Sequence, residues 1–167
     1  MILISKQTMA KTILQPLMFL AISAVTFVVC YLLALIVSGG TIEADGMSLI
    51  MMAMFLSFAI HWLLFIPSYI FQTEKFYDLT GSLTYLTVIW FVYLSSNQIG
   101  NINIQNLIVT VLISIWAIRL GSFLFSRIHK DGEDKRFRSI KTSASQFFMT
   151  WTLQGMWVSI CSMCAIT

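Results

Sequence analysis

Two adjacent residues in this sequence, Tyr77 and Asp78, have side chains that could take part in chemistry. They stand together at the start of an apolar stretch. A tyrosine hydroxyl can donate a proton to a substrate carbonyl, and a carboxylate can act as an acid or hold a cation. We treat both as candidate catalytic residues. The alternatives are that Tyr77 anchors the chain at a membrane interface and that Asp78 caps a helix or forms a structural ion pair.

Arg119 is a third candidate, because the run from Leu107 to Phe125 is otherwise uncharged. An arginine at the centre of a membrane helix costs about 2.5–3.5 kcal/mol on insertion scales. Helical side chains lean toward the helix N-terminus, so in a helix that runs toward the cytoplasm Arg119 points deeper into the membrane. We therefore expect it to contact a partner or a polar cavity. Asp78 is the expected ion-pair partner, because both residues belong to the same side of the membrane.

The densest group of charges lies between residues 126 and 146. Its basic members are Arg127, Lys130, Lys135, Arg136, Arg138 and Lys141, and Asp131, Glu133 and Asp134 lie among them. Arginine forks match the geometry of phosphate oxygens, so this loop could hold a nucleotide at the cytoplasmic mouth of a membrane protein. It could equally be a solvated surface attracted to anionic lipid, and charge alone does not separate these interpretations.

The composition that surrounds these residues is that of an integral membrane protein. Of 167 residues, 58% are hydrophobic and 10% are charged, and the mean hydropathy is +0.86, whereas soluble domains carry about 25% charged residues. We expect the chain in a bacterial inner membrane or, in a eukaryote, in the endoplasmic reticulum. Because the basic residues cluster between apolar segments instead of forming a stripe, nucleic-acid binding is disfavoured.

Runs of roughly 20 apolar residues, the length that spans a bilayer as a helix, recur along the chain. We predict one all-α polytopic membrane domain over residues 1–167. Its five transmembrane helices are expected near 17–38, 47–71, 79–97, 107–125 and 147–167, with a basic cytoplasmic loop at 126–146. Lys and Arg favour cytoplasmic loops, so the N-terminus is expected inside and the C-terminus outside.

Other residue types that often carry chemistry have simpler interpretations here. His61 has no second histidine or carboxylate within a turn, so we expect a structural role and no metal site. Cys30, Cys161 and Cys164 fall in apolar runs and are expected to be buried small residues. Patterns typical of soluble nucleotide-binding, protease and hydrolase sites do not occur.

Four segments together carry a resemblance to a known family. They are F-Y-D-L-T-G-S at 76–82, W-A-I-R-L-G-S-F-L-F-S-R-I at 116–128, G-E-D-K-R-F at 132–137 and L-Q-G-M-W-V at 153–158. In this combination the chain resembles the DUF1295 membrane proteins, which are related to steroid 5-alpha-reductases. The resemblance implies an NADPH-dependent membrane enzyme that reduces a carbon–carbon double bond conjugated to a carbonyl, in a steroid or another lipid-like substrate.

The same resemblance assigns roles to particular residues. It implies that the cofactor is held by Arg119, Arg127, Asp134 and Arg136, with membrane lipid and a hydrophobic substrate as partners. Members of that family continue into a segment like S-R-H-P-N-Y-x-G-E, which supplies much of the cofactor pocket and does not occur in these 167 residues. We therefore expect the chain to correspond to an N-terminal half that does not bind NADPH alone and requires a separately encoded C-terminal half.

The alternative is a non-catalytic membrane protein, a truncated remnant or packing partner, in which Asp78 and Arg119 merely pair. A third hypothesis is the related fold of membrane methyltransferases, whose cofactor site would also lie outside this sequence.

Overall fold

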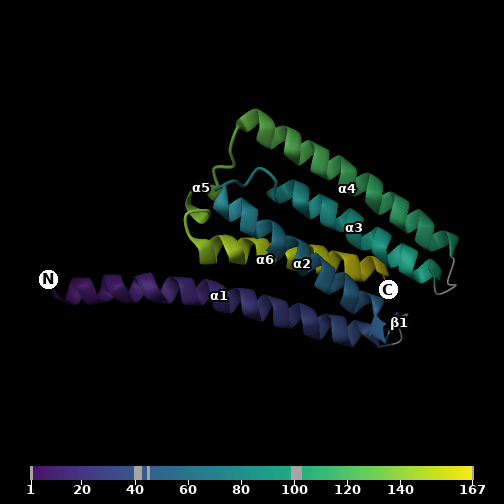
Figure 1. Ribbon diagram of the computed structural model, residues 1–167, viewed down its shortest axis with the longest axis horizontal. Coiled ribbons are helices and arrows are strands. Elements are labelled where there is room, and N and C mark those ends of the chain that lie inside the picture. The colour runs from purple at the N-terminus through teal and green to yellow at the C-terminus, as the bar shows by residue number, and fades with distance from the viewer. Residues whose placement is uncertain (1, 40–42, 45, 99–102, 167) are drawn as a thin grey trace.

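The computed structural model describes residues 2–39, 43–44, 46–98 and 103–166, and it is built almost entirely from helices (Figure 1). In chain order the helices are α1 (Ile2–Ser38), α2 (Leu49–Ile70), α3 (Tyr77–Gln98), α4 (Ile104–Asp131), the single-turn α5 (Phe137–Ile140) and α6 (Ala144–Ile166). This confirms the predicted all-α polytopic bundle.

Four helices of the described chain are long and apolar enough to cross a membrane, over Leu14–Ser38, Leu49–Ile70, Tyr77–Asn97 and Ile104–Asp131. The fifth predicted span corresponds to α6, which has 23 residues and is therefore also long enough to cross. Serine, threonine and glutamine side chains lower its hydropathy, and it is not one of the four spans named above. A polytopic membrane protein follows from the four apolar helices alone.

The helix boundaries differ from the predicted ones most at the start of α1, which begins at Ile2 and not near residue 17, and next at the charged loop. Helix α4 continues to Asp131, so residues 126–131 of the predicted loop are helical, and α5 forms a further turn within it. Gly132 ends α4 with φ of 80°, a conformation that glycine adopts without strain, and its N–H donates to the Ile128 carbonyl. The loop between the helices is consequently shorter and more ordered than its charge suggests.

A small hairpin joins α1 to α2. Strands β1 (Glu43–Ala44) and β2 (Met47–Ser48) pair antiparallel with Glu43 opposite Ser48. Ser48 then caps α2, because its hydroxyl accepts a hydrogen bond from the Ile50 N–H at 3.2 Å. This tight connection sets α1 and α2 antiparallel.

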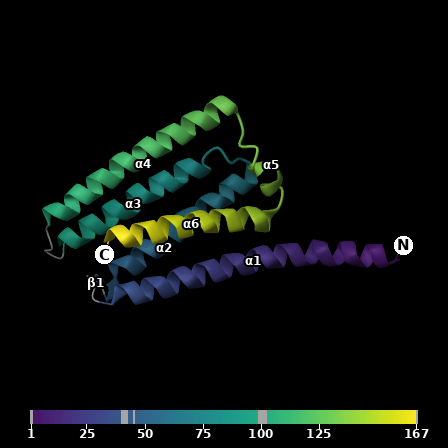
Figure 2. The same cartoon turned by 180° about the vertical axis from the view of Figure 1, so that it is seen from behind.

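Helix α6 is the central element of the bundle. It packs on α1, α2 and α3, whereas α4 packs mainly on α3 and lies at the edge, as Figures 1 and 2 show from opposite sides. The N-terminus lies beyond the end of the bundle where α5 is found, and the C-terminus lies at the opposite end near the hairpin. We call the end with α5 the basic end; it is the one predicted to face the cytoplasm.

Glycines allow two of these helix pairs to approach closely. A Cβ at Gly121 of α4 would lie 2.8 Å from Cβ of Ser82 on α3, and a Cβ at Gly155 of α6 would lie 3.3 Å from the Phe58 ring on α2. Small residues at helix contacts are the usual means of tight packing in membranes, where lipid provides no hydrophobic drive between helices. Glycine is thus required at position 121 because Ser82 leaves no room for a side chain there, and not because of the backbone conformation.

Candidate functional site

Two loops meet at the basic end, residues 71–76 after α2 and residues 132–143 around α5. Glu74 joins them: its side chain accepts a hydrogen bond from the Asp134 N–H at 3.2 Å and another from Lys141 Nζ at 2.8 Å. Glu74 is only 3% exposed, so both interactions take place away from bulk water. A buried carboxylate needs such partners. Glu74 therefore positions the charged loop against the start of α3.

Asp134 and Arg136 form a second interaction within the charged loop. The Arg136 Nε donates to both carboxylate oxygens of Asp134 at 3.0 Å, and the Arg136 backbone N–H donates to one of them at 3.0 Å. These contacts with the Arg136 guanidinium hold the pKa of Asp134 below its usual range, and they raise the pKa of Arg136. The Arg136 guanidinium therefore has a fixed orientation, but the Asp134 carboxylate already neutralises its charge.

Glu133 and Arg138 form an ion pair on the outside of the same loop. Arg138 lowers the pKa of the Glu133 carboxyl, and Glu133 raises that of Arg138. Both side chains are well exposed, at 42% and 69%, so water screens the attraction. This pair contributes little to the stability of the loop.

Asp78 pairs with Arg127 and not with Arg119, which corrects the predicted partner. Arg127 of α4 reaches the Asp78 carboxylate at 3.6 Å. Arg119 is exposed on α4 and forms no ion pair with the part of the chain that the structure describes. The physical reason is distance along the helix: Asp78 opens α3 at the basic end, and Arg127 lies about 12 Å nearer that end than Arg119 at 1.5 Å per residue.

Tyr77 holds α3 against α6. Its hydroxyl donates to the Thr150 carbonyl at 3.0 Å, and its ring lies edge-on to Trp151 with centroids 5.3 Å apart. The ring of Phe137 of α5 also packs against Tyr77, with centroids 4.9 Å apart. The hydroxyl proton is therefore engaged by a backbone carbonyl, so proton donation to a substrate would require this hydrogen bond to break.

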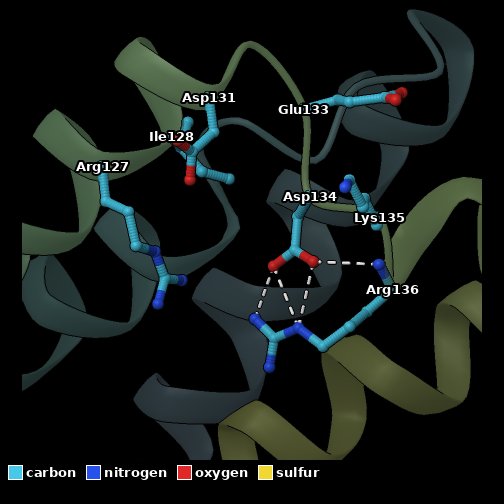
Figure 3. Close-up of a pocket in the computed structure, with 7 residues that line it drawn as sticks. All are labelled: Arg127, Ile128, Asp131, Glu133, Asp134, Lys135 and Arg136. Atoms are coloured by element: carbon cyan, nitrogen blue, oxygen red, sulfur yellow. Dashed lines mark hydrogen bonds and ion pairs between the residues drawn. The ribbon is translucent and has the colours of Figure 1, made fainter.

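A cavity of about 560 Å³ opens beside these interactions. It is lined by Arg127, Ile128, Asp131, Glu133, Asp134, Lys135 and Arg136. Figure 3 shows the Asp134 carboxylate facing the Arg136 guanidinium, with the Arg127 side chain approaching from α4. The lining has three basic and three acidic residues, so its formal charges cancel. Because the lining has no net charge to attract a ligand, binding here would depend on how the individual charged side chains are oriented.

The predicted site residues thus fall into three groups. Arg127, Asp134 and Arg136 line the same cavity, and Asp78 is connected to it through Arg127. Tyr77 lies at the α3–α6 contact, and Arg119 lies away from the cluster on α4. The residues predicted to bind a cofactor are therefore brought together, apart from Arg119.

The sequence interpretation did not identify Lys135 as a cavity residue or Glu74 and Lys141 as a pair. A signal for Glu74 was present, because a carboxylate in a short connection between two apolar segments needs a cation nearby. Its partner lies 67 positions away and could not be found by spacing.

The remaining candidate residues are structural or exposed. His61 is fully buried, its Nδ1 lies 2.8 Å from the Ser57 carbonyl, and its Nε2 has no hydrogen-bond partner among the described residues, so its structural role stays a prediction. Cys30 is buried as expected, but Cys161 and Cys164 are exposed on α6, contrary to the prediction. No group of three or more metal-binding side chains occurs among the described residues.

Comparison with known proteins bears on the same region. The model of the family described as "Protein of unknown function (DUF1295)" matches residues 64–167. The chain belongs to the DUF1295 family. No curated protein and no solved structure matches it. The DUF1295 region includes α3, α4, α5 and α6, so the charged cavity and the residues that hold it together lie within the family's part of the chain.

Proposed function

We propose that this chain forms the cytoplasmic cofactor-facing part of an NADPH-dependent membrane reductase, which acts on a carbon–carbon double bond conjugated to a carbonyl. One observation carries the proposal: Arg127 from α4 and Lys135 and Arg136 from the charged loop line one cavity at the basic end of a membrane bundle. The motifs that resemble steroid 5-alpha-reductases supply these residues. A soluble anionic cofactor would meet such a membrane enzyme at this end.

The cavity suits the phosphate groups of the cofactor. Arg127 has a side chain that is 42% exposed and a long contact of 3.6 Å to Asp78, so it can turn toward a phosphate. Lys135 is exposed and forms no ion pair among the described residues. Arg136 is occupied by Asp134, so it would bind through the N–H groups left free. Bound NADPH would supply the hydride for the reduction.

Acidic residues around the cavity would orient its basic residues. Asp134 fixes the Arg136 fork, Asp78 restrains Arg127, and Glu74 with Lys141 holds the loop in place. Such support is what a phosphate site requires, because a side chain that is already positioned loses less entropy on binding. The proton that the reduction also requires is not assigned to Tyr77, whose hydroxyl is bonded to Thr150.

Arg119 suggests where a partner would bind. It is exposed on the outer side of α4, a helix that otherwise presents apolar residues such as Ile115 and Ile118. A guanidinium in this setting is costly unless an acidic or polar group covers it. We propose that a further membrane segment, such as a C-terminal half carrying the S-R-H-P-N-Y-x-G-E type of motif, packs on this face and completes the cofactor site.

A specific observation favours the alternative, a non-catalytic membrane protein. Four acidic residues at the basic end, Glu74, Asp78, Glu133 and Asp134, each pair with a basic residue of the chain itself. A cluster that is balanced in this way could hold the loops together without binding any ligand. The two functions differ in whether Arg127 and Lys135 bind an external phosphate.

The deciding experiment measures NADPH binding by fluorescence in lipid nanodiscs. The chain is tested alone and after co-expression with the C-terminal half of a DUF1295 relative. We expect measurable binding only for the complex, weakened at least about tenfold by Arg127→Gln, since hydrogen bonds to charged groups contribute about 1.5–3 kcal/mol.

Lys130→Gln is the matched control. Lys130 is an exposed basic residue of the same helix turn that does not line the cavity, so its loss should leave binding nearly unchanged. Equal effects of the two substitutions would indicate a general charge effect, and a complex that forms without binding NADPH would favour the non-catalytic alternative.

A further inference from the structure

One exposed face of α4 lies opposite the charged cavity. Ile118, Ser122, Phe125 and His129 follow one another at intervals of four, three and four residues, the spacing that places side chains on one face of a helix. All four are exposed. Arg127 lies two positions from both Phe125 and His129, or about 200° around the helix, and it lines the charged cavity. This face of α4 is therefore separate from that cavity.

Helix α3 contributes to the same surface. Phe76, directly before α3, lies nearly parallel to Phe125, with ring centroids 6.3 Å apart and ring planes at 27°. Leu83 follows Phe76 by seven residues, about two helical turns, and both side chains are 51% exposed. Tyr85, two positions after Leu83, reaches the Trp157 carbonyl of α6 with its hydroxyl. Leu83 therefore lies on the side of α3 that faces away from α6.

Positive charge lies where this surface meets the basic end. Lys75 comes immediately before Phe76, and Lys130 immediately follows His129, whose ring stacks on Phe125 with centroids 6.4 Å apart. Both lysines are exposed and form no ion pair with the part of the chain that the structure describes. We call the following residues the outer strip: Lys75, Phe76, Leu83, Ile118, Phe125 and Lys130.

The carboxylates closest in sequence do not neutralise these lysines. Glu74, beside Lys75, is 3% exposed and paired with Lys141. Asp131, beside Lys130, lines the charged cavity on the other side of α4. The outer strip therefore presents positive charge toward its surroundings, although the lining of the charged cavity is balanced.

The order of side chains along the outer strip matches that of a phospholipid. Leu83 and Ile118 lie inside the apolar spans of α3 and α4, at the depth of acyl chains. Phe125 lies about two turns nearer the basic end than Ile118, and its ring offers apolar area to the upper part of such a chain. Lys75 precedes the α3 span and Lys130 lies at the end of the α4 span, at the depth of phosphates. Basic residues beside a membrane helix attract anionic lipid.

We propose that the outer strip binds one anionic phospholipid, whose phosphate is held by Lys75 and Lys130 and whose acyl chain lies against Phe76 and Phe125. The recognised chemistry is a phosphate anion joined to an acyl chain, which free phosphate lacks. This binding does not depend on the proposed reductase activity, because no residue of the outer strip lines the charged cavity.

The test is native mass spectrometry of the purified chain in detergent, titrated with phosphatidylglycerol and, separately, with phosphatidylcholine. We expect one phosphatidylglycerol to bind about tenfold or more tightly than phosphatidylcholine, because each lysine near an anionic headgroup contributes roughly fivefold. Excess inorganic phosphate should not displace the bound lipid, since it cannot replace the acyl contacts.

Two double variants separate the outer strip from general charge. Lys75→Gln/Lys130→Gln should weaken phosphatidylglycerol binding about tenfold or more and leave phosphatidylcholine binding nearly unchanged. Lys135→Gln/Arg138→Gln removes the same number of exposed cations from the same end of the bundle but outside the outer strip. It should leave both affinities nearly unchanged.

Two phenylalanines of α4 test the acyl contact. Phe125→Ala should weaken the binding of both phospholipids roughly threefold, because each has acyl chains that contact the ring. Phe123 is 64% exposed and lies two positions away, on the opposite side of α4, so Phe123→Ala should have little effect. Circular dichroism confirms that every variant is folded.

Three results would overturn the proposal. The first is equal affinity for the two phospholipids, which indicates surrounding lipid only. The second is equal loss in the two double variants, which indicates a general charge effect. The third is displacement by inorganic phosphate, which indicates a site for a soluble anion. If the Lys75→Gln/Lys130→Gln variant does not fold, the phenylalanine pair decides, and equal effects of Phe125→Ala and Phe123→Ala then reject the outer strip.

Discussion

Lys141 and Glu74 form the most enclosed ion pair of the described chain, with Nζ and Oε2 separated by 2.8 Å and side chains that are 21% and 3% exposed. The two residues connect the loop after α2 to the loop before α6. This contact makes the charged loop part of the folded bundle and sets the position of Asp134, whose N–H also binds Glu74.

Lys141→Met should therefore lower the free energy of unfolding by about 3 kcal/mol, because it leaves a carboxylate buried without its cation. Reversible unfolding in detergent with increasing dodecyl sulfate measures the change. Adding Glu74→Gln should recover much of the loss, since the remaining buried group is then neutral. Lys130→Met, at an exposed position, is the control. If Lys141→Met had no larger effect than the control, the pair would not stabilise the loop.

Gly121→Ala should separate α3 from α4. The added methyl would meet Cβ and Oγ of Ser82 at 2.8 and 2.9 Å, and overpacking of this kind costs about 1–3 kcal/mol. Gly81→Ala should cost less, because the side chain that its methyl would meet is the flexible end of Gln154. Thermal unfolding followed by circular dichroism compares the two variants.

The exchanged variant Ser82→Gly/Gly121→Ala moves the methyl to the facing helix and should recover part of the stability lost in Gly121→Ala. Equal losses in Gly121→Ala and Gly81→Ala would contradict the close approach at Gly121.

The charged loop should lose stability in acid. Arg136 lowers the pKa of Asp134 below its ordinary value of 3.8, so the carboxylate stabilises the fold above that pH. The contribution is lost as the pH falls through the lower pKa of the folded state. The melting temperature should therefore fall between pH 5 and pH 2 more steeply in the native chain than in Asp134→Asn. Glu133→Gln should change the profile little, because Glu133 is exposed and screened by water.

The sequence predicted the helices well and the contacts between them poorly. Lengths and apolar composition placed α2 and α3 within two residues of their observed ends, because lipid imposes those features on every membrane helix. Which charged side chains form an ion pair depends on how each helix is rotated about its axis and on where it ends. Arg119 was assigned to Asp78 because both were taken to lie near one membrane face, but α4 extends to Asp131 and brings Arg127 to Asp78 instead.

The same limits apply to the candidate site. The cluster of Arg127, Asp134 and Arg136 could be anticipated because these residues are close in sequence and lie in one loop region. A second cavity of about 320 Å³, whose lining includes Tyr85 of α3, Trp116 of α4 and Trp157 of α6, could not be anticipated, since its residues come from three separate helices and none has a distinctive sequence pattern.

A double-mutant cycle separates the two arginines of α4. Asp78→Asn and Arg127→Gln should be coupled by about 0.5–1 kcal/mol in the free energy of unfolding, as expected for a partly exposed pair at 3.6 Å. Asp78→Asn and Arg119→Leu should be additive, because Arg119 forms no ion pair among the described residues. Coupling with Arg119 but not with Arg127 would restore the pairing predicted from sequence.

Arg119→Leu should itself raise the stability of the isolated chain, because it removes an exposed guanidinium from an apolar face, and it should weaken association with a C-terminal half if that half covers Arg119.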